Sequence, residues 1–347
     1  MSQKTPVTIL GATGSVGQRF VSLLENHPWF EIAKLCASDK SEGKTYAQAT
    51  NWILSTPIPA SIRDRKISSC TPSVKEGLTF SALSSNVAGP IETSYAAQGA
   101  KVISCSKNHR MDESVPMVIP EVNGDHIELI HQQKFPHGGY IVTKPNCSVI
   151  ALCMALKPLL DSFGLEAVSV VTMQAASGAG FPGVPSLALF DNVIPYIEDE
   201  EEKMESEPNK IFAKLQNSKL QFLPLSISSS CNRIPVTEGH MEVVSVKLKK
   251  KSTLEALKDA WLSWKNPLES FELPSSPTKM IYYFDEPQFP QTRLHRDFDK
   301  GMAVHIGRLR KCPILDFKFT LLSHNTLRGA AGGALLTAEL LAKKNLL

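Results

Sequence analysis

The segment that most constrains the fold is a glycine-rich turn near the start of the chain. The apolar run Val7–Leu10 precedes the turn Gly11-Ala-Thr-Gly14-Ser-Val-Gly17, and a helical pattern over 16–25 follows it. Glycines permit a tight turn and a close backbone approach, and the N–H groups at a helix N-terminus bind a pyrophosphate. The G-x-x-G-x-x-G spacing is a variant of the dinucleotide-binding fingerprint. The predicted cofactor-binding positions in this turn are Gly11, Thr13, Gly14, Ser15 and Val16.

The first 145 residues alternate short apolar runs with helical stretches. Further strands are predicted at 31–37, 78–83 and 101–104, with a helix over 91–97. A strand–helix–strand order at this spacing indicates a parallel sheet with crossover helices. This part of the chain therefore predicts a Rossmann-like domain that binds a dinucleotide.

The loop after the second predicted strand bears on the choice of dinucleotide. An acidic residue at this place favours the free ribose hydroxyl of NAD, whereas serine and lysine side chains accept the 2′-phosphate of NADP. Ser38, Ser41 and Lys44 indicate NADP, and Asp39 among them favours NAD. We predict NADP as the cofactor.

The remainder of the chain has a different pattern. A strong helical segment over 149–160 leads into longer alternating stretches at 167–173, 241–248 and 314–322. Such alternation is typical of half-buried strands in a mixed or antiparallel sheet. The Ala- and Leu-rich segment 329–344 predicts a C-terminal helix.

These patterns together predict an α/β fold with two domains, in agreement with a length of 347 residues at roughly 100–200 residues per domain. Residues 1–145 predict an N-terminal Rossmann-like NADP-binding domain. Residues 146–324 predict an α+β catalytic and dimerisation domain with a mixed sheet. The C-terminal helix, about 325–347, is expected to pack back on the first domain.

Composition excludes several classes of partner. The formal net charge is +3, so no overall basic field indicates nucleic acid or a membrane surface. The central apolar run 149–156 is shorter than the roughly 20 residues that a bilayer span requires. Because the chain begins almost directly with a strand, we expect no signal peptide and a cytoplasmic location. The expected partners are small molecules.

The seven cysteines are scattered, without a Cys-x-x-Cys motif, which predicts reduced thiols and no structural zinc site. Cys147 differs from the others because Lys144-Pro-Asn146-Cys147-Ser148 opens the predicted helix at 149–160. The positive end of a helix dipole lowers the pKa of a thiol and favours the thiolate. We therefore predict that Cys147 is a nucleophile with a lowered pKa.

Other motifs follow this one in chain order. Thr172-Met-Gln174-Ala-Ala-Ser177-Gly178 runs from a strand into a glycine-rich turn, and Arg233 lies seven residues before His240. The set of motifs also includes the turn at 11–17, the segment around Arg110, Pro120-Glu-Val-Asn123 and the segment around Asn325. Taken together, these motifs resemble those of the aspartate-semialdehyde dehydrogenase family. The resemblance covers essentially the whole chain and is greatest to the branch found in archaea and fungi.

The resemblance implies a role for each matching residue. Cys147 matches the nucleophile, His240 the acid/base catalyst, and Gln174 the residue that places the substrate near the reacting carbonyl. Arg233 matches the residue that binds the substrate carboxylate, to which a planar bidentate guanidinium is suited. Further cofactor-binding positions that the family implies are Ser177, Gly178 and Asn325.

An acidic segment over 199–204 matches a glutamate for the substrate amine and a lysine for phosphate. Glu200 and Lys203 match these roles, and Glu201 is an alternative register for the glutamate. A solvated helix face is the alternative interpretation of this segment. The remaining residues that the resemblance implies are Asn146 for the substrate, and Arg110 and Asn108 together with Lys203 for phosphate. Cys105 has no predicted role.

The resemblance implies the NADPH-dependent reduction of L-aspartyl 4-phosphate to L-aspartate 4-semialdehyde through a cysteine thioester. This reaction belongs to the aspartate pathway to threonine, methionine, isoleucine and, in some organisms, lysine. Two alternatives remain open: a CoA-thioester reductase of the same fold that resembles malonyl-CoA reductase, and a catalytically inactive NADP-binding protein. The alternating strands of the second domain predict pairing between subunits, hence a homodimer or a homotetramer.

Overall fold

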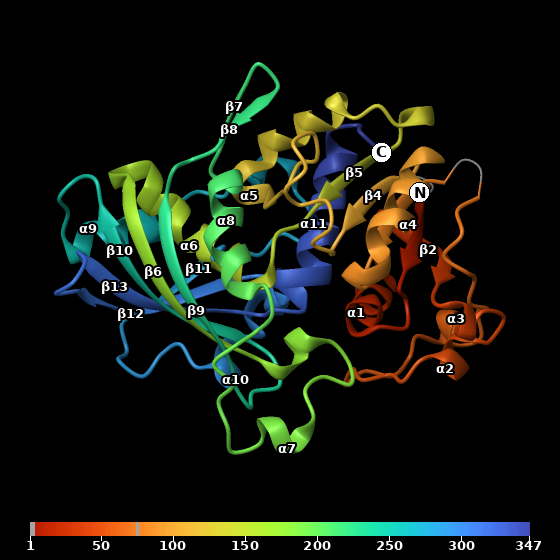
Figure 1. The fold of residues 1–347 in the computed structure, drawn as a ribbon, viewed down its shortest axis with the longest axis horizontal. Coiled ribbons are helices and arrows are strands. Elements are labelled where there is room, and N and C mark those ends of the chain that lie inside the picture. Colours follow the sequence, from red (N-terminus) through yellow and green to blue (C-terminus); the bar gives the residue numbers. More distant parts are fainter. Residues whose placement is uncertain (1–3, 74–75) are drawn as a thin grey trace.

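The computed structural model describes residues 4–73 and 76–347 and contains two large sheets side by side (Figure 1). The first sheet has five parallel strands in the order β2-β1-β3-β4-β5. Its strand order departs from chain order at β1, so crossovers run in both directions and leave helices on both faces. The strands are β1 (Thr5–Leu10), β2 (Phe30–Cys36), β3 (Leu78–Ser81), β4 (Lys101–Ser104) and β5 (Tyr140–Thr143).

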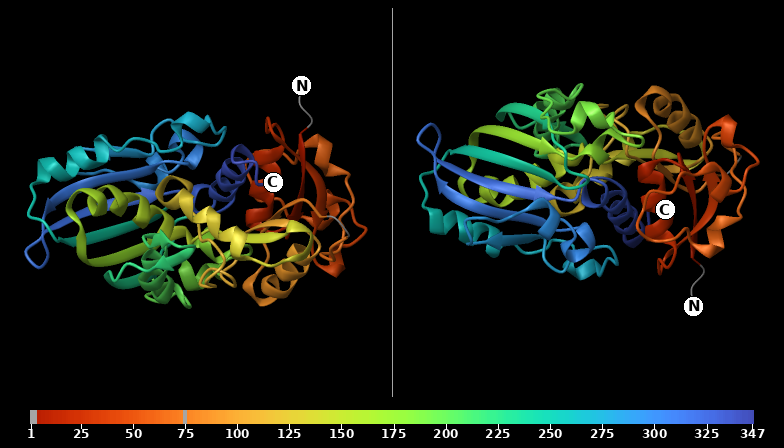
Figure 2. Two further views of the ribbon diagram at one scale, coloured as in Figure 1. Left: turned by 90° about the horizontal axis from the view of Figure 1, so that it is seen from above. Right: turned by 90° about the horizontal axis from the view of Figure 1, so that it is seen from below.

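Helices cover the two faces of this sheet. On one face α1 (Ser15–Leu24) and the C-terminal α11 (Gly332–Lys343) belong to the same hydrophobic core as β1 and β3. On the other face α4 (Ser85–Ala97) packs through Tyr95 and Ala96. Figure 2 shows α11 between the first sheet and the rest of the molecule. Three short helices are α2 (Tyr46–Ala49), α3 (Ala60–Arg63) and α5 (Pro120–Asn123).

The second sheet is mixed, as the sequence predicts, with six strands in the order β11-β12-β13-β10-β6-β9. β6 pairs with β9, and β11 with β12, in parallel, and the other neighbours are antiparallel. The strands are β6 (Leu165–Gln174), β9 (Ser226–Arg233), β10 (His240–Leu248), β11 (Ile281–Phe284), β12 (Val304–Lys311) and β13 (Phe317–Ser323).

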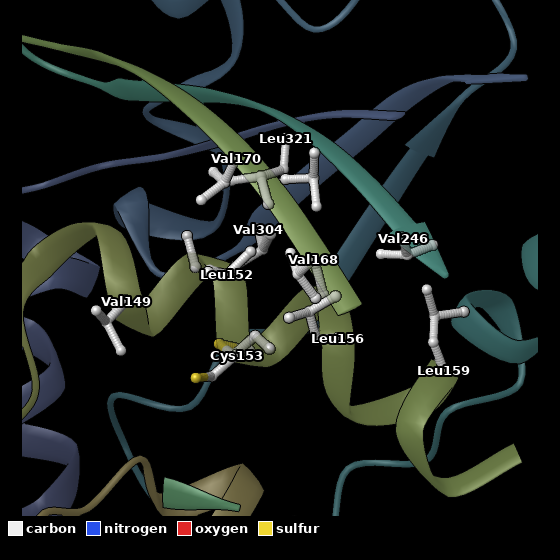
Figure 3. Packing of buried hydrophobic residues seen from close by; sticks show 14 of the residues in the cluster. Val149, Leu152, Cys153, Leu156, Leu159, Val168, Val170, Val246, Val304 and Leu321 are labelled. Atoms are coloured by element: carbon white, nitrogen blue, oxygen red, sulfur yellow. The ribbon is translucent and has the colours of Figure 1, made fainter. Parts of the chain in front are cut away.

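The long helix α6 (Cys147–Phe163) forms the centre of the second core. Leu152 and Leu156 on this helix lie toward Val170 and Val168 of β6 (Figure 3). Complete burial of each such side chain contributes about 1.5–3 kcal/mol. This packing fixes the first turn of α6, which carries Cys147, against the sheet.

Smaller elements surround this core. α8 (Glu200–Ile211) covers β9, and α9 (Leu254–Leu262) packs on α6. The others are α7 (Ser186–Leu189), α10 (Thr292–His295) and the hairpin of β7 (Lys214–Gln216) with β8 (Lys219–Gln221).

Several predicted elements have other bounds in the structure, and two of the differences have a clear local cause. The helix predicted at 91–97 begins at Ser85, because its first turns contain the weak helix formers Gly89 and Pro90 and escape a periodicity search. The strand predicted from Ile314 begins at Phe317, because residues 312–316 form a turn in which the Cys312 N–H donates to the Asp316 carbonyl (3.1 Å). Strands β5, β7, β8, β9, β11 and β12 are not predicted from the sequence.

The face of the second sheet opposite α6 has accessible apolar side chains. Val171 is 41% exposed, and Met173, Met241 and Val243 on the same face are half-buried. Within residues 4–73 and 76–347, no helix combines the length and the apolar character needed to span a membrane.

Candidate active site

A cleft of about 1060 Å³ lies where the two sheets meet. The loops after β1, β2, β3, β4 and β5 line one side of it, which is the carboxyl edge where open parallel sheets bind ligands. The ends of β6 and β9 line the other side, together with residues 325–330. The cleft therefore joins the predicted nucleotide turn to the predicted nucleophile.

Most of the predicted site residues line this cleft. They are Gly11, Thr13, Gly14, Ser15, Val16, Ser38, Arg110, Asn146, Cys147, Gln174, Ser177, Gly178, Glu200, Lys203, Arg233 and Asn325. Ser41, Lys44, Asn108 and His240 are outside this set. Ser41 and Lys44 lie further along the loop after β2, and Asn108 donates from Nδ2 to the Ser85 carbonyl (3.0 Å).

The nucleotide turn is shaped by close backbone contacts. Gly11 has φ +73°, and a Cβ on Gly17 would lie 2.1 Å from the Gly11 carbonyl oxygen, so both positions require glycine. α1 begins at Ser15 without a side-chain cap, which leaves its first N–H groups facing the cleft. These free donors fit the pyrophosphate of a dinucleotide. Ser38 lines the adjoining part of the cleft, beside Asp39.

Cys147 is the first residue of α6 and is partly accessible to the cleft. Asn146 caps the helix: its Oδ1 accepts the N–H groups of Ser148 (2.9 Å) and Val149 (3.4 Å). The Asn146 Nδ2 donates to Glu200 (2.8 Å). Asn146 therefore uses its side chain to orient the turn that carries the thiol.

The prediction of a lowered thiol pKa is wrong for this structure. Burial, followed by the charge of Glu200, raises the pKa of Cys147 to about 11. The cations Lys144, Arg110 and Arg233 oppose this shift and favour the thiolate. Desolvation exceeds the helix dipole here because the walls of the cleft shield the thiol from water.

Gly329 closes one side of the nucleophile. A Cβ on Gly329 would lie 2.7 Å from the Cys147 Cβ and 3.1 Å from its Cα. The π-helical turn Leu327–Ala331 brings Gly329 to this place. Arg328 in the same turn makes a buried bidentate ion pair with Glu121, with both N–O distances 2.6 Å. Glu121 belongs to the Pro120–Asn123 motif of the sequence, which thus supports the wall of the site.

Gln174 and Arg233 end two neighbouring parallel strands and are paired in register. Both are buried, and Arg233 Nη1 donates to the Ala175 carbonyl (2.7 Å). Because this bond uses only part of the guanidinium, donors remain for an anion in the cleft. Their position next to Cys147 fits the recognition of a carboxylate substrate.

His240 begins β10 and lies directly behind Gly178, where an added Cβ would be 3.2 Å from the His240 Nε2. Its Nδ1 accepts the Ala175 N–H (3.0 Å), so the ring proton of neutral His240 is on Nε2. Burial, followed by the charges of Arg233 and His324, lowers the pKa of His240 to about 3. His240 is therefore a neutral imidazole that can donate from Nε2.

Helix α8 places the two candidate glutamates of the acidic segment differently. Glu200 is buried in the cleft and accepts from Lys203 Nζ (3.3 Å) as well as from Asn146. Glu201 instead accepts the backbone N–H of Cys231 (3.0 Å) and is not a lining residue. The structure thus brings Glu200, and not Glu201, together with Cys147.

Three further residues of the site were not predicted from the sequence. Lys144 is buried and lines the cleft, and its position three residues before Cys147 was a usable signal. The Cys105 carbonyl accepts from Arg110 Nη2 (3.1 Å). Glu207 accepts from Arg110 Nη1 (2.8 Å), a contact between residues 97 positions apart that no local pattern indicates.

The fold and the site together define a class of protein. The molecule combines a parallel-sheet nucleotide domain with a second domain that has a mixed sheet, and a cysteine and a histidine lie at their junction. The class is that of nicotinamide-dependent dehydrogenases that act through a cysteine thiol. Residues 6–130 match the family model "Semialdehyde dehydrogenase, NAD binding domain", and residues 156–328 match "Semialdehyde dehydrogenase, dimerisation domain".

Relatives define the family more narrowly. The chain is 45% identical to aspartate-semialdehyde dehydrogenase of Archaeoglobus fulgidus, over 98% of this chain and 99% of the relative. It is 40% identical to the Saccharomyces cerevisiae enzyme over the full length of both. The structure of the Candida albicans enzyme with NADP aligns with TM-score 0.91 and 37% identity, over 99% of this chain and 100% of that one. The chain belongs to the aspartate-semialdehyde dehydrogenase family, which confirms the predicted family and fold class.

Proposed function

We propose that the protein reduces L-aspartyl 4-phosphate to L-aspartate 4-semialdehyde with NADPH, in the aspartate pathway to threonine, methionine and isoleucine. Membership of the family supports this reaction, as does the NADP of the Candida albicans structure. The observation that carries the proposal is the convergence, in one cleft, of Cys147, Arg233, Glu200 and Arg110. A thiol, a carboxylate-binding cation, an amine-binding anion and a phosphate-binding cation match the four functional groups of this substrate.

In the proposed reaction the sulfur of Cys147 attacks the acyl carbon and forms a C–S bond, while the C–O bond to phosphate breaks and the thiol proton leaves with the phosphate. Phosphate leaves toward Arg110 and Lys203, which both line the cleft. NADPH, when bound, supplies a hydride to the thioester carbon. His240, the proposed acid/base catalyst, shares its Nε2 proton with the resulting oxyanion through a hydrogen bond and retains it as the C–S bond breaks and the aldehyde leaves.

The other site residues support these steps. Gln174 places the substrate beside the thiol, Arg233 binds its carboxylate and Glu200 its amine, with Asn146 beside them. The N–H groups at the start of α1 hold the NADP pyrophosphate, and Ser177, Gly178 and Asn325 contact its nicotinamide half. Ser38, with Ser41 and Lys44, is proposed for the 2′-phosphate, and Asn108 for the substrate phosphate.

The test is oxidation of aspartate semialdehyde with NADP, with and without inorganic phosphate. Phosphate-dependent turnover that is lost in Cys147→Ala, with NADPH binding retained, is the expected result. Full activity of Cys147→Ala would refute the assignment of the nucleophile. Consumption of NADPH with malonyl-CoA, without a phosphate requirement, would support the CoA-thioester alternative instead. NADPH binding without any turnover would support the inactive protein.

We further propose a homodimer or homotetramer formed through the accessible face of the second sheet. The match to a dimerisation domain supports association, and the exposed Val171 with its apolar neighbours gives it a surface. The proposed division is a nucleotide domain over 1–145 with 325–347, and a catalytic domain over 146–324. The hydrophobic core that α11 shares with β1 supports this division. We propose a cytoplasmic location.

A further inference from the structure

One face of helix α8 extends from the cleft into the buried interior of the protein. Glu200, Lys203, Glu207 and Lys210 recur at intervals of three or four residues, so they lie along one face of the helix. Glu200 and Lys203 line the cleft, whereas Glu207 and Lys210 are buried beyond it. The proposed function uses only the first two residues and gives the buried pair no role.

The carboxylate of Glu207 joins two parts of the active site. One oxygen accepts from Arg110 Nη1 (2.8 Å), and the other accepts the backbone N–H of Asn146 (2.7 Å). The side chains of Glu207 and Arg110 are 3% and 7% exposed. Charge-assisted hydrogen bonds that are shielded from water in this way are strong and directional.

Asn146 transmits this contact to the nucleophile. It caps α6 immediately before Cys147, its Oδ1 accepts two helix N–H groups, and its Nδ2 donates to Glu200. The backbone N–H of Asn146 donates to Glu207, and its Nδ2 donates to Glu200. Both donor groups of Asn146 therefore have a partner on α8. The first turn of α6 is therefore fixed relative to α8 through two glutamates.

Arg110 is fixed from two directions. Its side chain is bound by Glu207 and by the Cys105 carbonyl, and its Nε is buried without a hydrogen-bond partner among the described residues. Its backbone carbonyl accepts from Lys210 Nζ (2.6 Å), which also donates to the carbonyls of Asp112 (2.7 Å) and Val115 (2.9 Å). The guanidinium thus has one defined orientation with a donor left for a ligand.

We propose that Glu207 is a positioning residue that sets the distance between the phosphate-binding guanidinium of Arg110 and the thiol of Cys147. This proposal rests on the proposed function, because it assigns Arg110 to phosphate. Glu207 also balances the charge of Arg110 before substrate binds, without which the buried cation would be unpaired. It contacts neither substrate nor cofactor and acts through Arg110 and Asn146.

The first test is Glu207→Gln, measured as KM and kcat for phosphate, aldehyde and NADP in the oxidative direction. The expected result is a rise of about tenfold to a hundredfold in KM for phosphate, with KM for NADP unchanged, because a charged hydrogen bond that orients Arg110 is lost. Glu205→Gln is the matched control on the same helix, since among the described residues the Glu205 carboxylate accepts hydrogen bonds from Ser229 alone. An unchanged KM for phosphate, or an equal loss in every parameter, would overturn the proposal.

A double variant makes the test independent of the folding of Glu207→Gln. If Glu207 acts through Arg110, then Glu207→Gln added to Arg110→Ala causes no further rise in KM for phosphate. The double variant removes the charges of both Glu207 and Arg110, so it leaves neither of them as an unpaired ion in the interior. Its KM for phosphate is compared directly with that of Arg110→Ala. Additive effects of the two substitutions would overturn the proposal. Absence of phosphate-dependent turnover in the wild-type protein would instead refute the proposed function.

Discussion

Gly329 offers the sharpest test of how the site is built, because its substitution by alanine adds one methyl group against the nucleophile. The new Cβ would lie 2.7 Å from the Cys147 Cβ and 3.3 Å from its carbonyl oxygen. The φ of Gly329 is not in the left-handed region, so the backbone tolerates alanine and only the contact is costly. The separation must grow by about 0.7 Å to reach the 3.4 Å of ordinary contact.

Two effects follow from that displacement. Overpacking in a close-packed interior costs about 1–3 kcal/mol of folding stability. A misplacement of a reacting group by about 1 Å costs about a hundredfold in rate. We therefore expect Gly329→Ala to lower kcat/KM for aldehyde oxidation by about a hundredfold, with NADP affinity retained.

The assay combines steady-state kinetics, urea denaturation and NADP titration. Gly332→Ala is the control, because its Cβ would meet the Met302 Sδ at 2.5 Å and does not approach Cys147. It should lower stability while leaving kcat near the wild-type value. A folded Gly329→Ala protein with wild-type kcat/KM would refute the packing argument.

Two further predictions concern protonation. Because the pKa of Cys147 is raised to about 11, its alkylation by iodoacetamide in the ligand-free protein should accelerate about tenfold for each pH unit from about 7 to 10. Mass spectrometry of the Cys147 peptide measures this rate. A rate that stops rising below about pH 9 would contradict the prediction. Glu242 is buried on β10 with both side-chain oxygens lacking a partner among the described residues, and burial raises its pKa well above the usual value. The folded state therefore keeps this proton while the unfolded state loses it above about pH 4.5, so stability falls by about 1.4 kcal/mol per pH unit from there up to the folded pKa. Glu242→Gln should raise the free energy of unfolding at pH 7.5 but not at pH 4; an equal change at both pH values would contradict the linkage.

The sequence by itself determined the features that depend on neighbouring residues. The turn at 11–17 requires glycine for local steric reasons, and its strand–turn–helix context follows from periodicity alone. The Asn146 cap acts on the next three residues, so the start of the nucleophile helix is also a local property. For this reason the fold class is predicted correctly, and the family is recognised correctly from motifs of this local kind.

Local reasoning failed where a weak pattern depends on a distant partner. β9 reads Ser-Ile-Ser-Ser-Ser-Cys-Asn-Arg and has little hydrophobic signal, yet it forms a strand because β6 offers a parallel edge. Strand formation at such a segment reflects cross-strand pairing more than intrinsic propensity.

Only the tertiary structure decided the electrostatics of the site. The helix-dipole argument predicted a lowered pKa for Cys147, but burial and Glu200, 53 positions away, raise it. The contacts of Glu207 with Arg110 and of Gly329 with Cys147 likewise join segments far apart in the chain. Desolvation and charge–charge interactions depend on distances in space, which the order of residues does not specify.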